Sequence, residues 1–249
     1  MSYPDDGHAA CLQLEDRSFW FRHRNRCIAS VARRFPPEGV LLDIGGGNGY
    51  VSKGLTDAGF SCALVEPGVN GARAAFERGV DPVICARLED IGLARGSISA
   101  AGMFDVLEHI EDEAGALRRI HSLLRPGGRL FLTVPAYAFL FSTDDVVAGH
   151  FRRYTLRSLK HALAGSGFRP EYATYIFAPL PPFIFAMRTL PSLRGRRRPE
   201  DEEKQTFEHV REGVSARVVD RILEAEAQRV EAGRPIPFGS SCLAVYVRD

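Results

Sequence analysis

The stretch that decides the fold reads Leu41-Leu42-Asp43-Ile44-Gly45-Gly46-Gly47-Asn48-Gly49. An apolar run ends beside an acid, glycines follow at alternate positions, and a helical pattern begins near Tyr50. This order predicts a buried parallel strand, a tight turn and a helix whose N-terminus faces a ligand. Glycine suits the turn because a Cβ would block either the turn or the close approach of the ligand.

The spacing of the glycines narrows the class of ligand. A dinucleotide fingerprint places its third glycine where this chain has Tyr50. Asp43, just before the glycines, suits a cationic or amine-bearing ligand better than a pyrophosphate. Glu66 ends the next expected strand, roughly 20 residues beyond the turn, where a carboxylate can accept hydrogen bonds from a ribose. Asp43 and Glu66 together favour an adenosyl ligand over the simpler interpretation, a glycine-rich surface turn.

Two further motifs follow in order: Phe104-Asp105-Val106-Leu107-Glu108-His109, and Leu124-Arg125-Pro126-Gly127-Gly128-Arg129-Leu130. With Asp43-x-Gly45-x-Gly47-x-Gly49 and Glu66, the chain resembles the class I S-adenosylmethionine-dependent methyltransferases over about residues 41–168. The resemblance implies S-adenosyl-L-methionine as cofactor and methyl transfer as activity.

Alternation of short apolar runs with helical stretches from Leu41 to Leu132 predicts right-handed βαβ units. We expect an α/β fold, a Rossmann-like three-layer sandwich with a mostly parallel seven-stranded sheet. The resemblance implies an antiparallel last strand inserted between the fifth and sixth. The expected strands are Val40–Ile44, Ser61–Glu66, Val83–Ala86, Ile98–Phe104, Arg129–Val134, Glu171–Phe177 and Ser241–Val247.

One domain is expected over residues 1–249. It would comprise an N-terminal helical lid (12–35), the Rossmann-like core (40–177), a substrate-side insertion (178–237) and the last strand (238–249). Helices are expected over 112–124, 156–166 and 215–231, and a charged linker over 199–204.

The resemblance also implies which residues hold the cofactor. Asp43 and the loop Gly45, Gly46, Gly47, Asn48 and Gly49 would hold the methionine end, Glu66 the ribose, and Phe104 the methionine side of the sulfonium. Arg87 stands where the family usually has an acid for the adenine amine, so Leu88 or Glu89 would read the adenine edge instead. Arg24 is a candidate partner of the methionine carboxylate, the alternative being a solvated arginine on a packing helix.

The segment after the fifth expected strand should face the methyl acceptor. His150, with Asp145 nearby, is a candidate general base, because a neutral imidazole accepts a hydroxyl proton near neutral pH. The alternative is that the two residues only fix the loop. Arg152 and Arg153 would meet an anionic group or solvent, and His109 is expected to shape its turn rather than act in catalysis.

Composition excludes several classes of function. The formal net charge of +1 and the lack of a basic aromatic groove argue against nucleic acid as a partner. Five scattered cysteines without a C-x-x-C pair argue against a disulfide framework, and no metal site is expected. The polar, acidic N-terminus and this cysteine usage lead us to expect a cytoplasmic protein. Oligomeric state stays open.

The apolar run 178–187, followed by the basic run 194–198, would either touch a membrane surface weakly or receive a lipid-linked substrate. The alternative is a proline-rich cover over the sheet. The leading hypothesis is an O-methyltransferase acting on a small-molecule or lipid-linked metabolite. N- or C-methylation, and a non-catalytic S-adenosylmethionine-binding module that regulates a partner, are the alternatives.

Overall fold

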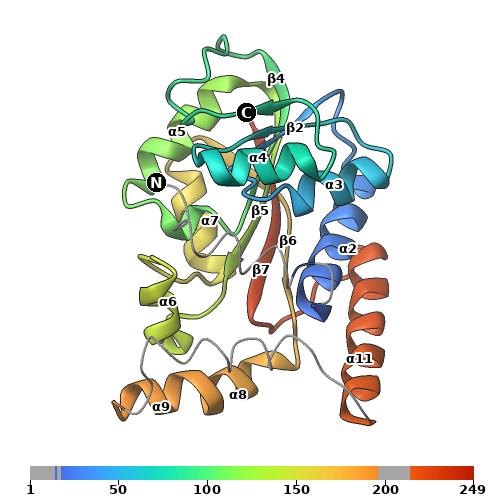
Figure 1. Cartoon of the computed structure of the whole chain (residues 1–249), viewed down its shortest axis with the longest axis vertical. Helices are drawn as coiled ribbons and strands as arrows, with labels where there is room; N and C mark the ends of the chain where they lie inside the picture. The colour runs from blue at the N-terminus through green and yellow to red at the C-terminus, as the bar shows by residue number, and fades with distance from the viewer. Residues whose placement is uncertain (1–14, 16–17, 196–213) are drawn as a thin grey trace.

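A computed structural model describes Glu15 and residues 18–195 and 214–249 of the chain. Its centre is a seven-stranded sheet in the order β3-β2-β1-β4-β5-β7-β6 (Figure 1). The strands are β1 Leu41–Ile44, β2 Cys62–Val65, β3 Val83–Ile84, β4 Ile98–Phe104, β5 Leu124–Pro135, β6 Phe168–Ile176 and β7 Ser241–Arg248. Neighbouring strands among β1 to β5 pair in parallel. The last strand, β7, runs antiparallel to both β5 and β6. The predicted fold class and the place of the last strand are confirmed.

Helices cover both faces of the sheet, because successive residues of each strand point to opposite sides. Leu42 and Ile44 join one apolar core, to which α5 (Glu113–Leu123) and α7 (Leu156–Ala164) contribute. Leu41 joins the other core, formed with α2 (Phe19–Arg34), α3 (Tyr50–Asp57) and α11 (Val214–Glu231). The helix α4 (Val69–Glu77) packs through Ala75 against a small cluster at β2. These layers are the expected three-layer sandwich.

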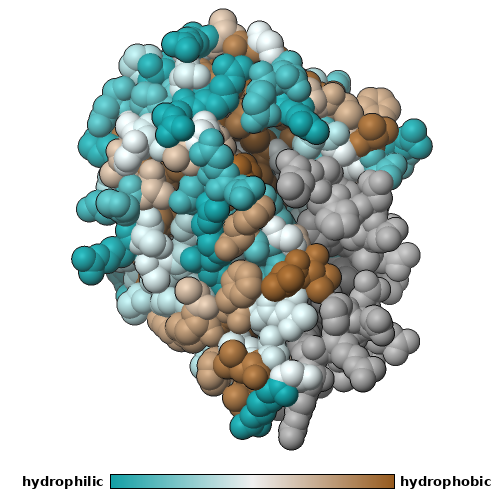
Figure 2. Space-filling view, turned by 90° about the vertical axis from the view of Figure 1, so that its left-hand side faces the viewer, coloured by the Kyte–Doolittle hydropathy of each residue, from teal (hydrophilic) through white to brown (hydrophobic). Residues whose placement is uncertain are grey.

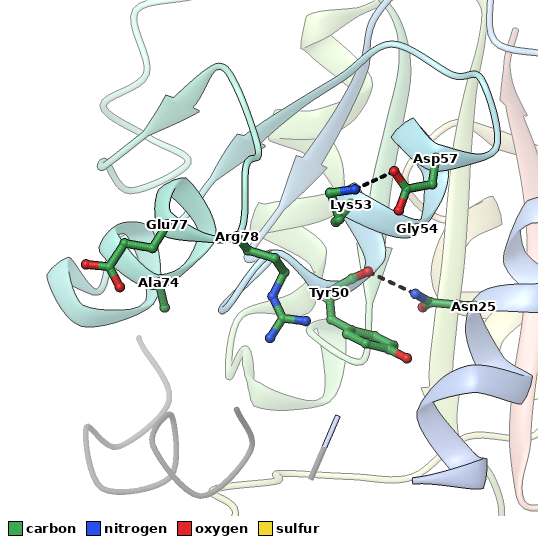
Figure 3. A pocket seen from close by; sticks show the side chains of 8 residues that line it. All are labelled: Asn25, Tyr50, Lys53, Gly54, Asp57, Ala74, Glu77 and Arg78. Atoms are coloured by element: carbon green, nitrogen blue, oxygen red, sulfur yellow. Dashed lines mark hydrogen bonds and ion pairs between the residues drawn. The ribbon is translucent and has the colours of Figure 1, made fainter. Parts of the chain in front are cut away.

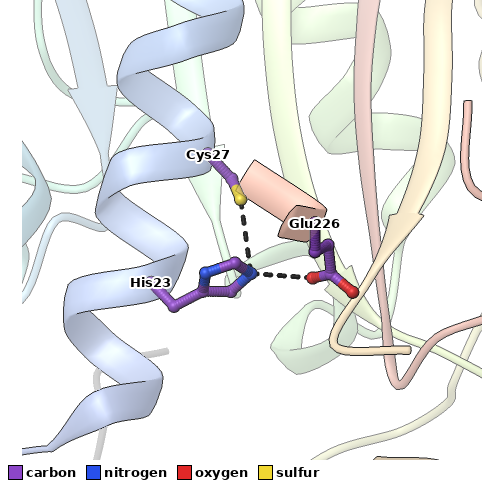
Figure 4. Close-up of side chains that lie close together, drawn as sticks. All are labelled: His23, Cys27 and Glu226. Atoms are coloured by element: carbon purple, nitrogen blue, oxygen red, sulfur yellow. Dashed lines mark hydrogen bonds and ion pairs between the residues drawn. The ribbon is translucent and has the colours of Figure 1, made fainter. Parts of the chain in front are cut away.

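A buried polar cluster joins α2 to α11 on the second face (Figure 4). His23 Nε2 lies 2.7 Å from a carboxylate oxygen of Glu226 and 3.5 Å from the Cys27 sulfur. The Glu226 carboxylate also accepts hydrogen bonds from the backbone N–H groups of Phe177 and Ala178, which follow β6. Glu226 therefore fastens the last long helix both to α2 and to the segment leaving the sheet.

Several element boundaries differ from the sequence expectation. The strand β5 begins at Leu124 rather than Arg129, because Leu124 already pairs with Ile98 before the register shifts in the β4–β5 ladder. The strand β6 begins at Phe168, and β3 keeps only Val83–Ile84. The predicted linker 199–204 and most of the first part of the predicted lid lie outside the described residues.

The first part of the predicted insertion is helical. It forms α8 (Leu180–Ile184), a π-helical turn (Phe185–Thr189) and α9 (Leu190–Leu193), at the end of the molecule where α6 (Thr143–Val147) also lies (Figure 1). The proline at the start of α8 fits, because the first helical turn does not need its missing N–H group. In the described part of the chain, no helix combines the length and the apolar character needed to cross a bilayer.

Candidate cofactor and acceptor site

The turn after β1 has the backbone that only glycine adopts readily. Gly45, Gly47 and Gly49 have φ values of +71°, +52° and +75°. A Cβ on Gly49 would come within 2.9 Å of the side chains of Ala75 and Val80. The turn therefore packs closely against Ala75 of α4 and Val80 after it, and it brings the start of α3 to the carboxyl ends of the strands, where α/β sheets bind ligands.

Asp43, in β1, is a buried carboxylate beneath this turn. Ser52 donates a hydrogen bond of 2.6 Å to its Oδ2, whereas its Oδ1 has no hydrogen-bond partner among the described residues. Burial raises the pKa of Asp43 to about 6, although the Ser52 hydrogen bond and the charge of Arg24 oppose the rise. A buried carboxylate with an unused acceptor fits a ligand that carries positive charge or amine N–H groups.

Glu66 follows β2 at the same edge of the sheet. Its Oε2 accepts a hydrogen bond of 3.0 Å from the N–H of Gly47, and its Oε1 accepts one of 2.7 Å from the N–H of Gly68. Asn48 is buried in the same loop. The structure thus brings the predicted ribose acid and the glycine turn into direct contact.

The predicted lid residue Arg24 lies over the end of β4. Its guanidinium pairs with Asp105, which has a φ of +57°, and its Cζ lies 4.6 Å from the centre of the Trp20 ring. Arg24 is predicted from the sequence as a site residue, but Asp105 is given no role there, although its position directly after β4 at the carboxyl edge is a signal for one. Phe104 packs over Gly102 in the core on the α2 face and is 7% exposed.

The adenine candidates are not brought together as one group. Leu88 is buried in the core on the α5 face, whereas Arg87 and Glu89 are exposed. Their assignment to the adenine edge remains a prediction.

The loop after β5, which the sequence predicts to face the methyl acceptor, is held by a charge cluster around the buried Asp145. His150 Nδ1 lies 2.7 Å from Asp145 Oδ1, and Arg153 donates to both oxygens of Asp145, at 2.7 and 3.0 Å. Asp145 also accepts from the backbone N–H of Ser142, completing the capping box of α6. Burial opposes ionisation of Asp145, but the hydrogen bonds from His150 and Arg153 prevail and lower its pKa to about 2. The predicted His150–Asp145 contact exists, and Asp145 also fixes the loop.

Glu108 and His109, which follow β4, face this loop. The rings of His109 and His150 meet edge to face, with their centres 4.6 Å apart. Burial and the neighbouring His150 lower the pKa of His109 to about 4. Glu108 is buried, and its Oε2 has no hydrogen-bond partner among the described residues. Burial and the charge of Asp105 raise the pKa of Glu108 well above its ordinary value. Glu108 was not among the residues predicted for the site.

A cavity of about 510 Å³ lies away from these groups, between α2, α3 and α4 (Figure 3). Its lining includes Asn25, Tyr50 and Arg78 but none of the predicted cofactor residues. The Asn25 amide donates to the carbonyl of Tyr50, which begins α3. The predicted cofactor residues Asp43 and Glu66 lie instead at the carboxyl ends of the strands, outside this cavity.

Comparison with known proteins decides the family. A family model described as a methyltransferase domain matches residues 16–173, more than half of the chain. The chain belongs to this methyltransferase domain family. The family and its relatives identify S-adenosylmethionine as the cofactor, and the open Asp43 oxygen beneath the glycine turn fits that cation.

Individual relatives are distant. A ubiquinone biosynthesis O-methyltransferase of Xanthomonas axonopodis pv. citri is 31% identical over 110 residues, covering 41% of this chain and 46% of the relative. A probable S-adenosylmethionine-dependent methyltransferase of Mycolicibacterium smegmatis is 26% identical over 179 residues, covering 70% and 68%. This chain therefore spans less than half of the length of the Xanthomonas relative and of a similar Pseudomonas enzyme.

Among solved structures, a Thermotoga maritima protein described as a possible histamine N-methyltransferase superposes with a TM-score of 0.62 at 15% identity. The superposition covers 98% of this chain and 95% of that one, and it supports the fold of the methyltransferase domain.

Proposed function

We propose that the protein transfers the methyl group of S-adenosylmethionine to a hydroxyl oxygen of a small-molecule or lipid-linked acceptor. The observation that carries this proposal is the pairing of the partly buried His150 with the buried Asp145 in the segment after β5. Because Asp145 engages Nδ1, Nε2 is the nitrogen that can take a proton from an acceptor hydroxyl. The M. smegmatis and Xanthomonas relatives are named as methyltransferases, the latter acting on oxygen in ubiquinone biosynthesis.

The sulfonium supplies an already activated methyl group, so the residues of this chain contribute mainly alignment and a dry site. Asp43 and the glycine turn would hold the methionine end, and Glu66 the ribose. Arg24, paired with Asp105 at the end of β4, would close the site from α2. His150 would accept the hydroxyl proton while Asp145 keeps its ring in place.

Aromatic side chains beside the acceptor loop support an apolar acceptor. Tyr137 follows β5 with a φ of +61°, and its ring lies 5.1 to 5.3 Å from the rings of Tyr175, Phe139 and Phe238. Apolar residues also gather in the lower part of the face in Figure 2, the end of the molecule with α6, α8 and α9. Exposed side chains there include Phe139, Val146, Val147, Phe185, Met187 and Leu193. This surface favours a lipid-linked acceptor and a weak membrane contact, with residues 178–195 as the acceptor-side cap.

The test combines binding and turnover. Titration calorimetry should show S-adenosylmethionine and S-adenosylhomocysteine binding equally to wild type and to His150→Ala. Methyl transfer to hydroxylated and lipid-linked metabolites should fall about 10²- to 10⁴-fold in His150→Ala. His161→Ala, an exposed histidine on α7, is the matched control. Absence of cofactor binding would refute the proposal, and undiminished turnover in His150→Ala would remove His150 from the chemistry.

A further inference from the structure

Glu108, His109 and His150 form a compact group of metal-binding side chains at the acceptor side of the site. Glu108 and His109 lie in the 3₁₀ turn Leu107–His109 after β4, and His150 lies in the loop after α6. One potential ligand atom from each residue lies within 4.8 Å of the other two. Two separate segments therefore bring a carboxylate and two imidazoles together.

The charges around this group leave one carboxylate without a cationic partner. Asp105 pairs with Arg24, and Asp145 pairs with Arg153. Glu108, 1% exposed, makes no ion pair within the described residues, and its Oε2 has no hydrogen-bond partner there. A buried carboxylate in this situation must either stay protonated or meet a cation.

His150 is oriented by a carboxylate, as metal-binding histidines usually are. Metal-binding histidines usually give their second ring nitrogen to a carboxylate, which fixes the ring and directs the other nitrogen at the metal. Asp145 binds Nδ1 of His150 at 2.7 Å, and Arg153 holds Asp145 through both carboxylate oxygens. Nε2 is thus the nitrogen left for a metal, and the support behind it is rigid.

We propose that Glu108, His109 and His150 bind a divalent first-row transition-metal ion beside the methyl acceptor. Two imidazoles and one carboxylate suit such ions better than Mg²⁺ or Ca²⁺, which prefer oxygen ligands. Three protein ligands also leave coordination positions open for an oxygen of the acceptor.

The catalytic consequence rests on the methyl transfer to a hydroxyl oxygen proposed above, with the ion taking over from the His150 imidazole the activation of that hydroxyl. The metal ion binds the acceptor hydroxyl and lowers its pKa, so that its proton passes to a solvent water. The alkoxide oxygen then bonds to the methyl carbon as the carbon–sulfur bond breaks, and S-adenosylhomocysteine leaves with the sulfur electron pair. In this arrangement Nε2 of His150 binds the metal ion and does not take the proton.

Titration of the tag-free, chelator-treated full chain with Co²⁺ tests the site, because ligand-field absorption reports its coordination. We expect one ion per chain, with affinity lowered about 10-fold or more in Glu108→Gln and His150→Ala, and about 10- to 100-fold in Asp145→Asn. Glu111→Gln and His161→Ala, both exposed, serve as matched controls and should bind like wild type. Circular dichroism spectra should show that each variant is folded.

The site would be overturned if the wild type did not bind Co²⁺ stoichiometrically, or if Glu108→Gln and His150→Ala bound Co²⁺ as tightly as the wild type. Glu108 would then be a protonated core residue. Azide should change the Co²⁺ spectrum if a coordination position is open. An unchanged spectrum would overturn the role in acidifying the acceptor. Calorimetry with S-adenosylmethionine on the metal-free protein separates the two proposals, because cofactor binding rests on Asp43 and Glu66 and needs no metal.

Discussion

Replacing Asp43 by asparagine should raise the stability of the cofactor-free protein relative to wild type progressively as the pH rises from about 4 to 8. Burial raises the pKa of Asp43 to about 6. The ionised carboxylate is therefore less favourable in the folded state than in the unfolded state. A carboxyl group whose pKa is higher in the folded than in the unfolded state destabilises the fold as pH rises. The penalty is absent below the ordinary pKa of 3.8, grows between 3.8 and about 6, and is constant above.

The separation between 3.8 and about 6 corresponds to about 3 kcal/mol at full ionisation. Asparagine removes this penalty, but its amide N–H groups lack acceptors, which costs about 1–3 kcal/mol at every pH. The pH dependence of the difference in unfolding free energy between variant and wild type therefore isolates the contribution of the ionised carboxylate. Asp43→Asn should gain about 3 kcal/mol relative to wild type between about pH 4 and pH 8.

Urea unfolding followed by the fluorescence of Trp20, the only tryptophan, measures this difference. Trp20 stacks on Phe177 at 5.3 Å between ring centres, so unfolding should change its emission. Asp57→Asn, an exposed change on α3, is the control and should show no comparable trend. A pH-independent difference for Asp43→Asn would refute the reasoning. The same variant should bind S-adenosylmethionine more weakly, because the cation loses its carboxylate.

Three other substitutions test the site and the fold around it. Glu66→Gln should weaken S-adenosylmethionine binding ~10-fold or more in calorimetry, since charge-assisted hydrogen bonds contribute about 1.5–3 kcal/mol each, whereas Glu111→Gln should not. Arg153→Ala leaves Asp145 buried without its guanidinium and should cost about 3–5 kcal/mol of unfolding free energy at neutral pH. That loss should shrink as pH falls toward about 2, where Asp145 becomes protonated in the fold; a loss independent of pH would contradict the ion pair. Glu226→Ala removes the acceptor for Phe177 and Ala178 and should lower the urea midpoint markedly, whereas the exposed Glu224→Ala should change it little; equal effects would argue against the cluster in Figure 4.

The sheet could be predicted from the sequence because its signals are local. Buried parallel strands give short apolar runs, and the turn after β1 gives glycines at the positions with positive φ. The boundaries of β5 and β6 were less predictable, because pairing partners far along the chain decide where a strand begins. Leu124 enters β5 through its pairing with Ile98, which no local pattern around Leu124 reveals.

The candidate site divides along the same line. Asp43 and Glu66 could be placed because each lies at the carboxyl end of a predicted strand, and parallel strands end at one edge of the sheet. Glu108 could not be singled out, since its significance depends on a loop that begins about thirty residues later and brings His150 to it. The ring of Phe104 packs in the core on the α2 face, and its predicted place at the methionine side of the sulfonium stays a prediction.

Three carboxylates at this edge of the sheet, Asp43, Glu108 and Asp145, are each only 1% exposed but differ in the direction of their pKa. Asp145 has Arg153 beside it, and its pKa falls. Asp43 and Glu108 have no such ion pair among the described residues, and their pKa values rise. The fold therefore carries a cost at two positions that a bound cation would relieve: on our proposals, the cationic cofactor at Asp43 and a metal ion at Glu108. Because a ligand that binds only the folded state stabilises it, each cation should raise the stability of the protein, and neutralising the matching carboxylate should abolish that gain.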